Sequence, residues 1–157
     1  HPDVATTLNG RPVDVPASTY YGSGNARRDD TSTSLVDTYT ATLNHFASLV
    51  ITKLDVLDHL SEIPVCTAYR HRGRLLEEMP ALASVLEEVE PVYETVAGWN
   101  CPTAGLRDYA ELPAAAKAYL QYLEVRTGVE VSVISTGPER DQTILRRGSA
   151  LEIWLGA

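Results

Sequence analysis

The sequence is poor in cysteine and in basic residues, and both shortages exclude whole classes of protein. Its 157 residues include two cysteines, Cys66 and Cys101, which provide neither a disulfide framework nor the ligand spacing of a metal site. Lysine and arginine number 13 against 21 aspartates and glutamates, for a net charge of −8. Because nucleic-acid affinity depends on cations that neutralise phosphates, we expect no nucleic-acid partner, and we expect no metal ligands.

Long apolar runs are also missing. No stretch approaches the ~20 residues that span a bilayer, and no signal-peptide pattern opens the chain, so we expect a cytoplasmic protein without a membrane partner. The first residue is His1 rather than methionine, which indicates a processed or excised form. The composition, with 44% hydrophobic and 22% charged residues, is that of a globular domain able to bury a core.

A phosphate-binding loop is absent as well. Nothing in the sequence reads Gly-x-x-x-x-Gly-Lys, and the one glycine-rich stretch, Gly22-Ser23-Gly24, follows no apolar strand. We therefore assign no residue to a phosphate-loop or general-base role, and predict no catalytic residue.

Apolar spacing predicts an α/β fold. Helical periodicity covers 34–47 and 113–127, and strand-like runs cover 48–51, 63–69 and 129–134. Pro113 and Gly128 suit the start and end of the second helix. A helix that leads directly into a strand, twice, is typical of α/β proteins. We expect a mixed, partly parallel sheet with flanking helices in a single domain.

Two polar segments follow two of these strands. Thr52-Lys53-Leu54-Asp55 comes after the strand at 48–51, and Ser135-Thr136-Gly137 comes after the strand at 129–134. In open α/β sheets, ligands bind at the carboxyl ends of the strands. We expect both segments to lie at one edge of one sheet and to share one small ligand.

The residue types suit guanine. The Asp55 carboxylate can accept hydrogen bonds from the ring N–H and the exocyclic amine of guanine, whereas adenine lacks that ring N–H and is rejected. The stem of Lys53 can lie on the base while its ammonium stays hydrated. The amides of Ser135, Thr136 and Gly137 can bind a base carbonyl. The alternative is a solvated turn, and Asp58, further along the chain, is expected to play no part in base selectivity.

These segments belong to a series of motifs that resembles the adenylosuccinate synthetases. The motifs stand in the family's order and at nearly its spacing, and they run from about residue 43 to residue 147: Thr52–Asp58, Val65–Arg70, Glu90–Thr95, Gly98-Trp99, Glu111–Pro113, Ala116, Tyr119, Ile134–Arg140 and Thr143–Arg146.

The resemblance implies the carboxyl-terminal part of a P-loop-type GTP-dependent ligase. In that reaction GTP phosphorylates the 6-oxygen of inosine monophosphate, and L-aspartate then displaces the phosphate. Mg²⁺ would be bound by GTP and by the family's amino-terminal part, which also carries the phosphate loop and the catalytic Asp and His. This chain alone is therefore expected to be inactive. The guanine and GTP contacts implied are Lys53, Leu54, Asp55, Ser135, Thr136, Gly137 and Arg27.

The family also has an arginine-rich substrate loop of pattern Thr-Gly-Arg-x-Arg-Arg. Counting back from Lys53 aligns it with Ser23, Gly24, Asn25, Arg27 and Arg28. Guanidinium groups bind carboxylates and phosphates with paired hydrogen bonds, so Asn25 in place of the first arginine departs from the pattern. We divide the chain into a largely irregular substrate-loop segment, 1–33, and an α/β guanine-recognition region, 34–157.

Two alternatives remain open. One is a non-catalytic module that binds a guanine nucleotide or a partner subunit. The other is a diverged ligase with a different acceptor, because Asn25 changes the substrate loop. In either case the chain can form a homodimer or associate with a partner that carries the phosphate loop.

Overall fold

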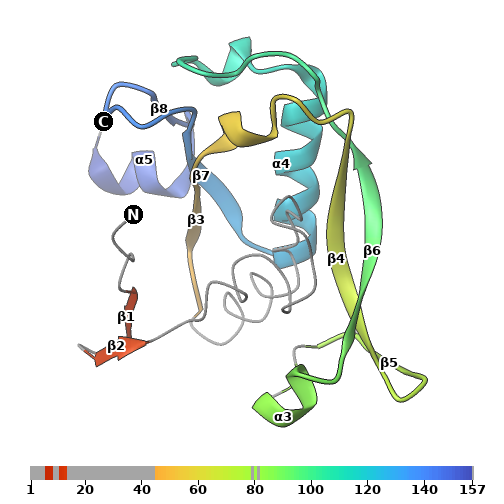
Figure 1. Cartoon of the computed structure of the whole chain (residues 1–157). Coiled ribbons are helices and arrows are strands. Elements are labelled where there is room, and N and C mark those ends of the chain that lie inside the picture. Colours follow the sequence, from red (N-terminus) through yellow and green to blue (C-terminus); the bar gives the residue numbers. More distant parts are fainter. Residues whose placement is uncertain (1–5, 9–10, 14–44, 79, 81, 157) are drawn as a thin grey trace.

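The computed structural model describes residues 6–8, 11–13, 45–78, 80 and 82–156 (Figure 1). Near the amino terminus, β1 (Thr6–Leu8) and β2 (Arg11–Val13) pair antiparallel. Most of the predicted helix at 34–47 lies outside the described residues, but its end does not: residues 45–47 form a turn and a bend. His45 has a left-handed φ of 52°, which no helix continues, so the prediction is wrong for these three residues.

The central sheet has the strand order β3-β7-β8. Strand β3 (Ser48–Ile51) pairs parallel with β7 (Glu130–Ser135), and β7 pairs antiparallel with β8 (Thr143–Leu145). The expected mixed, partly parallel sheet is confirmed. In the register of the parallel pair, Ile51 lies beside Ile134, so the two strands end at the same edge.

A second sheet has the order β5-β4-β6. Strand β4 (Glu62–His71) is longer than the predicted 63–69 and pairs antiparallel with both β5 (Arg74–Leu76) and β6 (Glu90–Ala97). Arg72 and Gly73 join β4 to β5 with φ of 48° and 79°, the positive values of a two-residue hairpin turn. The short helix α3 (Ala83–Leu86) leads from β5 towards β6.

Helix α4 (Ala114–Thr127) lies between the two sheets and contacts β6 and β7 (Figure 1). Pro113 precedes it and Gly128 ends it with a φ of 68°, as predicted. Helix α5 (Ala150–Leu155) also contacts β7. The described residues also form the 3-10 turns η1 (Leu54–Leu57) and η2 (Tyr109–Glu111). None of the helices in the described ranges is long and apolar enough to cross a membrane.

One apolar core joins α4, both sheets and η1. The buried face of α4 contributes Ala116, Tyr119, Leu120 and Leu123 to this core. Trp99 closes over it. Cys66 is buried in a smaller cluster with Tyr69 and Val89, and burial raises the pKa of its thiol. Packing in this core therefore holds the ends of β3 and β7 in place.

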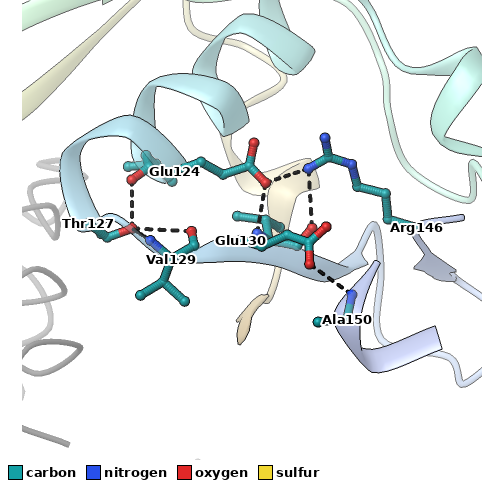
Figure 2. A network of polar contacts seen from close by, with 8 residues as sticks. Glu124, Thr127, Val129, Glu130, Arg146 and Ala150 are labelled. Atoms are coloured by element: carbon teal, nitrogen blue, oxygen red, sulfur yellow. Dashed lines mark hydrogen bonds and ion pairs between the residues drawn. The ribbon is translucent and has the colours of Figure 1, made fainter. Parts of the chain in front are cut away.

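Polar contacts hold α4 to the start of β7 (Figure 2). A Glu124 carboxylate oxygen accepts from the Val131 amide at 2.8 Å and from the Arg146 guanidinium. The Thr127 hydroxyl donates to the Leu123 carbonyl at 2.8 Å, and Glu130 accepts from the Ala150 amide at 2.8 Å. Since α4 leads into β7, these bonds fix the strand that carries the second polar segment.

Candidate functional site

The two predicted site segments lie side by side. Ile51 and Ile134 are register partners on parallel strands, and the polar segments begin immediately after them. Neighbouring strands are about 5 Å apart, so the segments start at roughly that separation. The turn η1 also contacts β7. The expectation that both segments share one sheet edge is confirmed.

Lys53 and Asp55 occupy a strained turn after β3. Lys53 has φ 57° and ψ 46°, a left-handed conformation that costs ~1 kcal/mol in a residue other than glycine. This conformation starts η1, which follows at once. Strain of this kind is concentrated at ligand sites, where the surrounding structure maintains it.

The Asp55 carboxylate has an unusual oxygen. Asp55 Oδ1 is buried, yet it has no hydrogen-bond partner among the described residues. A buried polar oxygen without a partner costs ~1–3 kcal/mol, so such atoms are rare. A donor from outside the described residues, such as a ligand, would satisfy this oxygen.

Leu54 contributes to the site in a different way from its neighbours. Its side chain is 1% exposed and packs in the core, so only its backbone can face a ligand. The side chain of Lys53 is exposed, which leaves its stem available to cover a base.

The second segment is held by bonds within the protein. The Thr136 amide donates to the Gln142 carbonyl at 2.9 Å, and the Thr136 hydroxyl donates to the Leu106 carbonyl at 2.8 Å. The Ser135 hydroxyl donates to the Gly137 carbonyl at 2.8 Å. Of the three amides expected to bind a base carbonyl, that of Thr136 is thus already used within the fold.

Gly137 packs closely against the side chain of Gln142. A Cβ at this position would lie 2.2 Å from Oε1 of Gln142, whose side chain also accepts from the Glu139 amide. The loop after β7 is therefore closed tightly around Gln142.

Sequence reasoning missed one part of the site. The carboxylate of Asp58, at the end of η1, accepts from Trp99 Nε1 at 2.8 Å, from the Thr103 amide at 2.6 Å and from the Thr103 hydroxyl at 2.6 Å. The partners lie 41 and 45 positions away along the chain. No local spacing signals such contacts, and the motif Gly98-Trp99 was the one available clue.

A cavity of about 230 Å³ adjoins the first segment. Its lining is mainly apolar and includes Val50, Val56, Tyr119 and Leu123. Asp55 and the residues 135–137 do not line it. We therefore place the candidate base site at the strand ends and not in this cavity.

The family of the chain follows from comparison with known proteins. A model of the family described as adenylosuccinate synthetase matches residues 23–144. The chain belongs to the adenylosuccinate synthetase family. The matched range contains η1, the segment 135–137 and also Ser23, Gly24, Asn25, Arg27 and Arg28, which lie outside the described residues.

Individual adenylosuccinate synthetases agree with this assignment. The enzyme of Solibacter usitatus is 58% identical over 118 residues, which cover 75% of this chain and 27% of that protein. The Coxiella burnetii enzyme is 47% identical over 108 residues, which cover 69% of this chain and 25% of that protein. A solved structure of fully ligated adenylosuccinate synthetase from Plasmodium falciparum has a TM-score of 0.65 at 33% identity, and covers 70% of this chain and 27% of that one.

The chain spans about a quarter of the length of these adenylosuccinate synthetases. The resemblance read from the motifs is confirmed, as is the α/β fold class. The matches do not favour a non-catalytic module or a ligase of another kind.

Proposed function

We propose that this chain supplies the guanine-recognition part of an adenylosuccinate synthetase, a GTP-dependent ligase that joins inosine monophosphate and L-aspartate. The observation that carries the proposal is the buried Asp55 Oδ1 without a partner, at the shared end of two parallel strands. A base that donates two adjacent N–H groups suits a carboxylate in this position, and guanine is such a base.

We assign the other contacts to the residues beside Asp55 by their chemistry. The exposed stem of Lys53 lies over one face of the base, and the Gly137 backbone amide donates to the base carbonyl. Leu54 contributes through its backbone. Ser135 and Thr136 shape the loop through their hydrogen bonds to Gly137, Leu106 and Gln142.

Substrate contacts are assigned by family alignment alone. Gly24, Arg27 and Arg28, with Ser23 and Asn25, correspond to the loop that binds aspartate and phosphate in the family, and Arg27 also reaches GTP. Two guanidinium groups suit these anions. Asn25 carries no charge, so we infer weaker anion binding at its position.

Mg²⁺ is the metal that the family implies. Among the described residues, no group of three or more His, Cys, Asp or Glu side chains can hold a metal ion. We assign no step through the metal to these residues.

Substitution of Asp55 tests the proposal. We expect wild-type chain to prefer GDP to ADP by about 5- to 150-fold, the range of a bidentate contact of ~1–3 kcal/mol, by analogy with base readout in nucleic acids. Asp55→Ala should bring the ratio close to one. Titrations followed by ¹H–¹⁵N chemical shifts measure weak affinities and report whether the Gly137 amide moves with GDP.

The control is Glu87→Ala, which removes an equal charge from an exposed position beyond α3. It should change GDP and ADP affinity in parallel and leave their ratio intact. An Asp55→Ala variant that keeps the wild-type ratio would show the guanine assignment to be wrong.

A further inference from the structure

One loop, Gly98–Leu106, is bonded to both halves of the candidate guanine site. At its start, Trp99 and Thr103 donate three hydrogen bonds to the Asp58 carboxylate, at 2.6–2.8 Å. At its end, the Gly105 amide donates to the Thr136 carbonyl at 3.2 Å, and the Leu106 carbonyl accepts from the Thr136 hydroxyl at 2.8 Å. The loop therefore bridges η1 and the segment after β7.

Asp58 is placed to control the position of Asp55. Its amide donates to the Asp55 carbonyl at 3.2 Å, so the two residues close one turn of η1. A 3-10 turn has three residues, which brings residues i and i+3 to the same side. Movement of Asp58 must therefore move Asp55.

Thr103 is the inner anchor of this arrangement. It is 0% exposed, and both its amide and its hydroxyl point to the same carboxylate. The Leu106 amide also donates to the Thr103 carbonyl at 3.1 Å. Thr103 is thus connected to Leu106, whose carbonyl accepts from the Thr136 hydroxyl.

Stability alone is a weak reason for such contacts. A partly buried carboxylate has a desolvation cost that its hydrogen bonds do little more than offset, and apolar side chains of similar volume often stabilise a fold equally well. What a multiply bonded carboxylate supplies is a defined position.

We propose that Asp58 and Thr103 are positioning residues for guanine selectivity: they set the distance between the Asp55 carboxylate and the Thr136-Gly137 backbone through the loop Gly98–Leu106. The inference rests on the proposed guanine site, and it departs from the expectation from the sequence that Asp58 plays no part in base selectivity. It predicts that base discrimination depends on residues that do not touch the base.

The test uses the full chain and compares GDP with inosine diphosphate, whose base lacks the exocyclic amine. Thr103→Val keeps the branched shape and removes the hydroxyl. Because Asp55 then loses its set position, we expect the preference for GDP to fall by about tenfold, within the range that a bidentate contact supplies. Thr103→Ser retains the hydroxyl and should restore the wild-type ratio.

The matched control is Thr127→Val. Thr127 is also buried, at 8% exposure, and its hydroxyl donates to the Leu123 carbonyl at the far end of α4. This variant should lower the melting temperature while the ratio stays at the wild-type value. If Thr103→Val is too unstable to titrate, Asp58→Asn replaces it, since an amide nitrogen in place of one carboxylate oxygen removes an acceptor and keeps the shape.

Two outcomes separate the inference from the proposed function. If Asp55→Ala leaves the ratio of the affinities for GDP and inosine diphosphate unchanged, the guanine site itself is refuted. If Asp55→Ala abolishes the preference but the Thr103 and Asp58 variants behave like Thr127→Val, the site stands and the positioning role is refuted.

Discussion

Asp55 and Asp58 lie three positions apart in one short turn, yet their surroundings differ. Asp58 receives three hydrogen bonds from a distant loop, whereas one oxygen of Asp55 is buried without a partner among the described residues. The first carboxylate is used within the fold, and the second is the one that we propose binds guanine. Residue type alone does not distinguish them, because the difference comes entirely from their neighbours.

At the residue scale, the sequence predicted those residues whose environment is local. Asp55 was singled out because its segment directly follows a strand, and Pro113 and Gly128 were recognised because they suit the two ends of a helix. The contacts of Asp58 could not be predicted, since its partners Trp99 and Thr103 lie 41 and 45 positions away along the chain. The closed loop around Gln142 was also missed.

Gly98 gives a sharp prediction about the start of the bridging loop. A Cβ here would lie 2.2 Å from the Leu60 carbonyl oxygen and 2.8 Å from the Leu60 carbonyl carbon. Backbone atoms cannot turn aside as a side chain can, so Gly98→Ala should destabilise the fold by at least ~1–3 kcal/mol, as overpacking does. Urea denaturation measures this loss.

Gly128→Ala is the comparison for this variant. Gly128 has a φ of 68° and no atom within 4 Å of an added Cβ, so the cost is conformational only, at ~1 kcal/mol. Equal stability losses for the two variants, or a Gly98→Ala protein as stable as wild type, would contradict the predicted clash.

At the element scale, α4 and β3 were the best-predicted parts of the chain. Helical spacing of apolar residues, with Pro113 and Gly128 at the two ends, defines α4 in the sequence and in the structure. The register of β3 beside β7 and the bulge between Leu49 and Val50 could not be predicted, because pairing depends on packing across the sheet. The end of the predicted first helix was misjudged, since periodicity does not reveal a backbone reversal such as that at His45.

Packing on α4 determines how firmly the strand ends are held. Leu120 is 0% exposed in the core, so Leu120→Ala should lower the free energy of unfolding by ~2–5 kcal/mol through lost burial and a residual cavity. Val125 lies on the same helix but is 77% exposed, and Val125→Ala should change stability by no more than ~0.5 kcal/mol. Thermal and urea unfolding of both variants checks this contrast, and a similar loss at the two positions would mean that α4 is not packed as described.

At the scale of the whole molecule, the fold class was predictable and the division into sheets was not. Direct helix-to-strand connections indicate α/β structure and a parallel pair. That β4, β5 and β6 form a separate antiparallel sheet follows from hairpin and long-range pairing. The family match adds that the described fold corresponds to about a quarter of a longer enzyme, with the candidate guanine site inside the matched range.

The last prediction concerns this chain as a catalyst. Phosphoryl transfer requires groups that hold the γ-phosphate and its metal, and electrostatic stabilisation of that kind supplies most of the rate. The sequence has no phosphate-loop pattern, and we assign it neither the catalytic Asp nor the catalytic His of the family. We therefore expect the purified chain to release no phosphate from GTP in the presence of inosine monophosphate, L-aspartate and Mg²⁺, even where it binds GDP.

A full-length synthetase, such as that of Coxiella burnetii, assayed in parallel shows that the conditions support the reaction. Phosphate release that depends on all three substrates and disappears in Asp55→Ala would prove the chain to be an enzyme by itself, and its phosphate site would then have to lie in residues that we have not assigned.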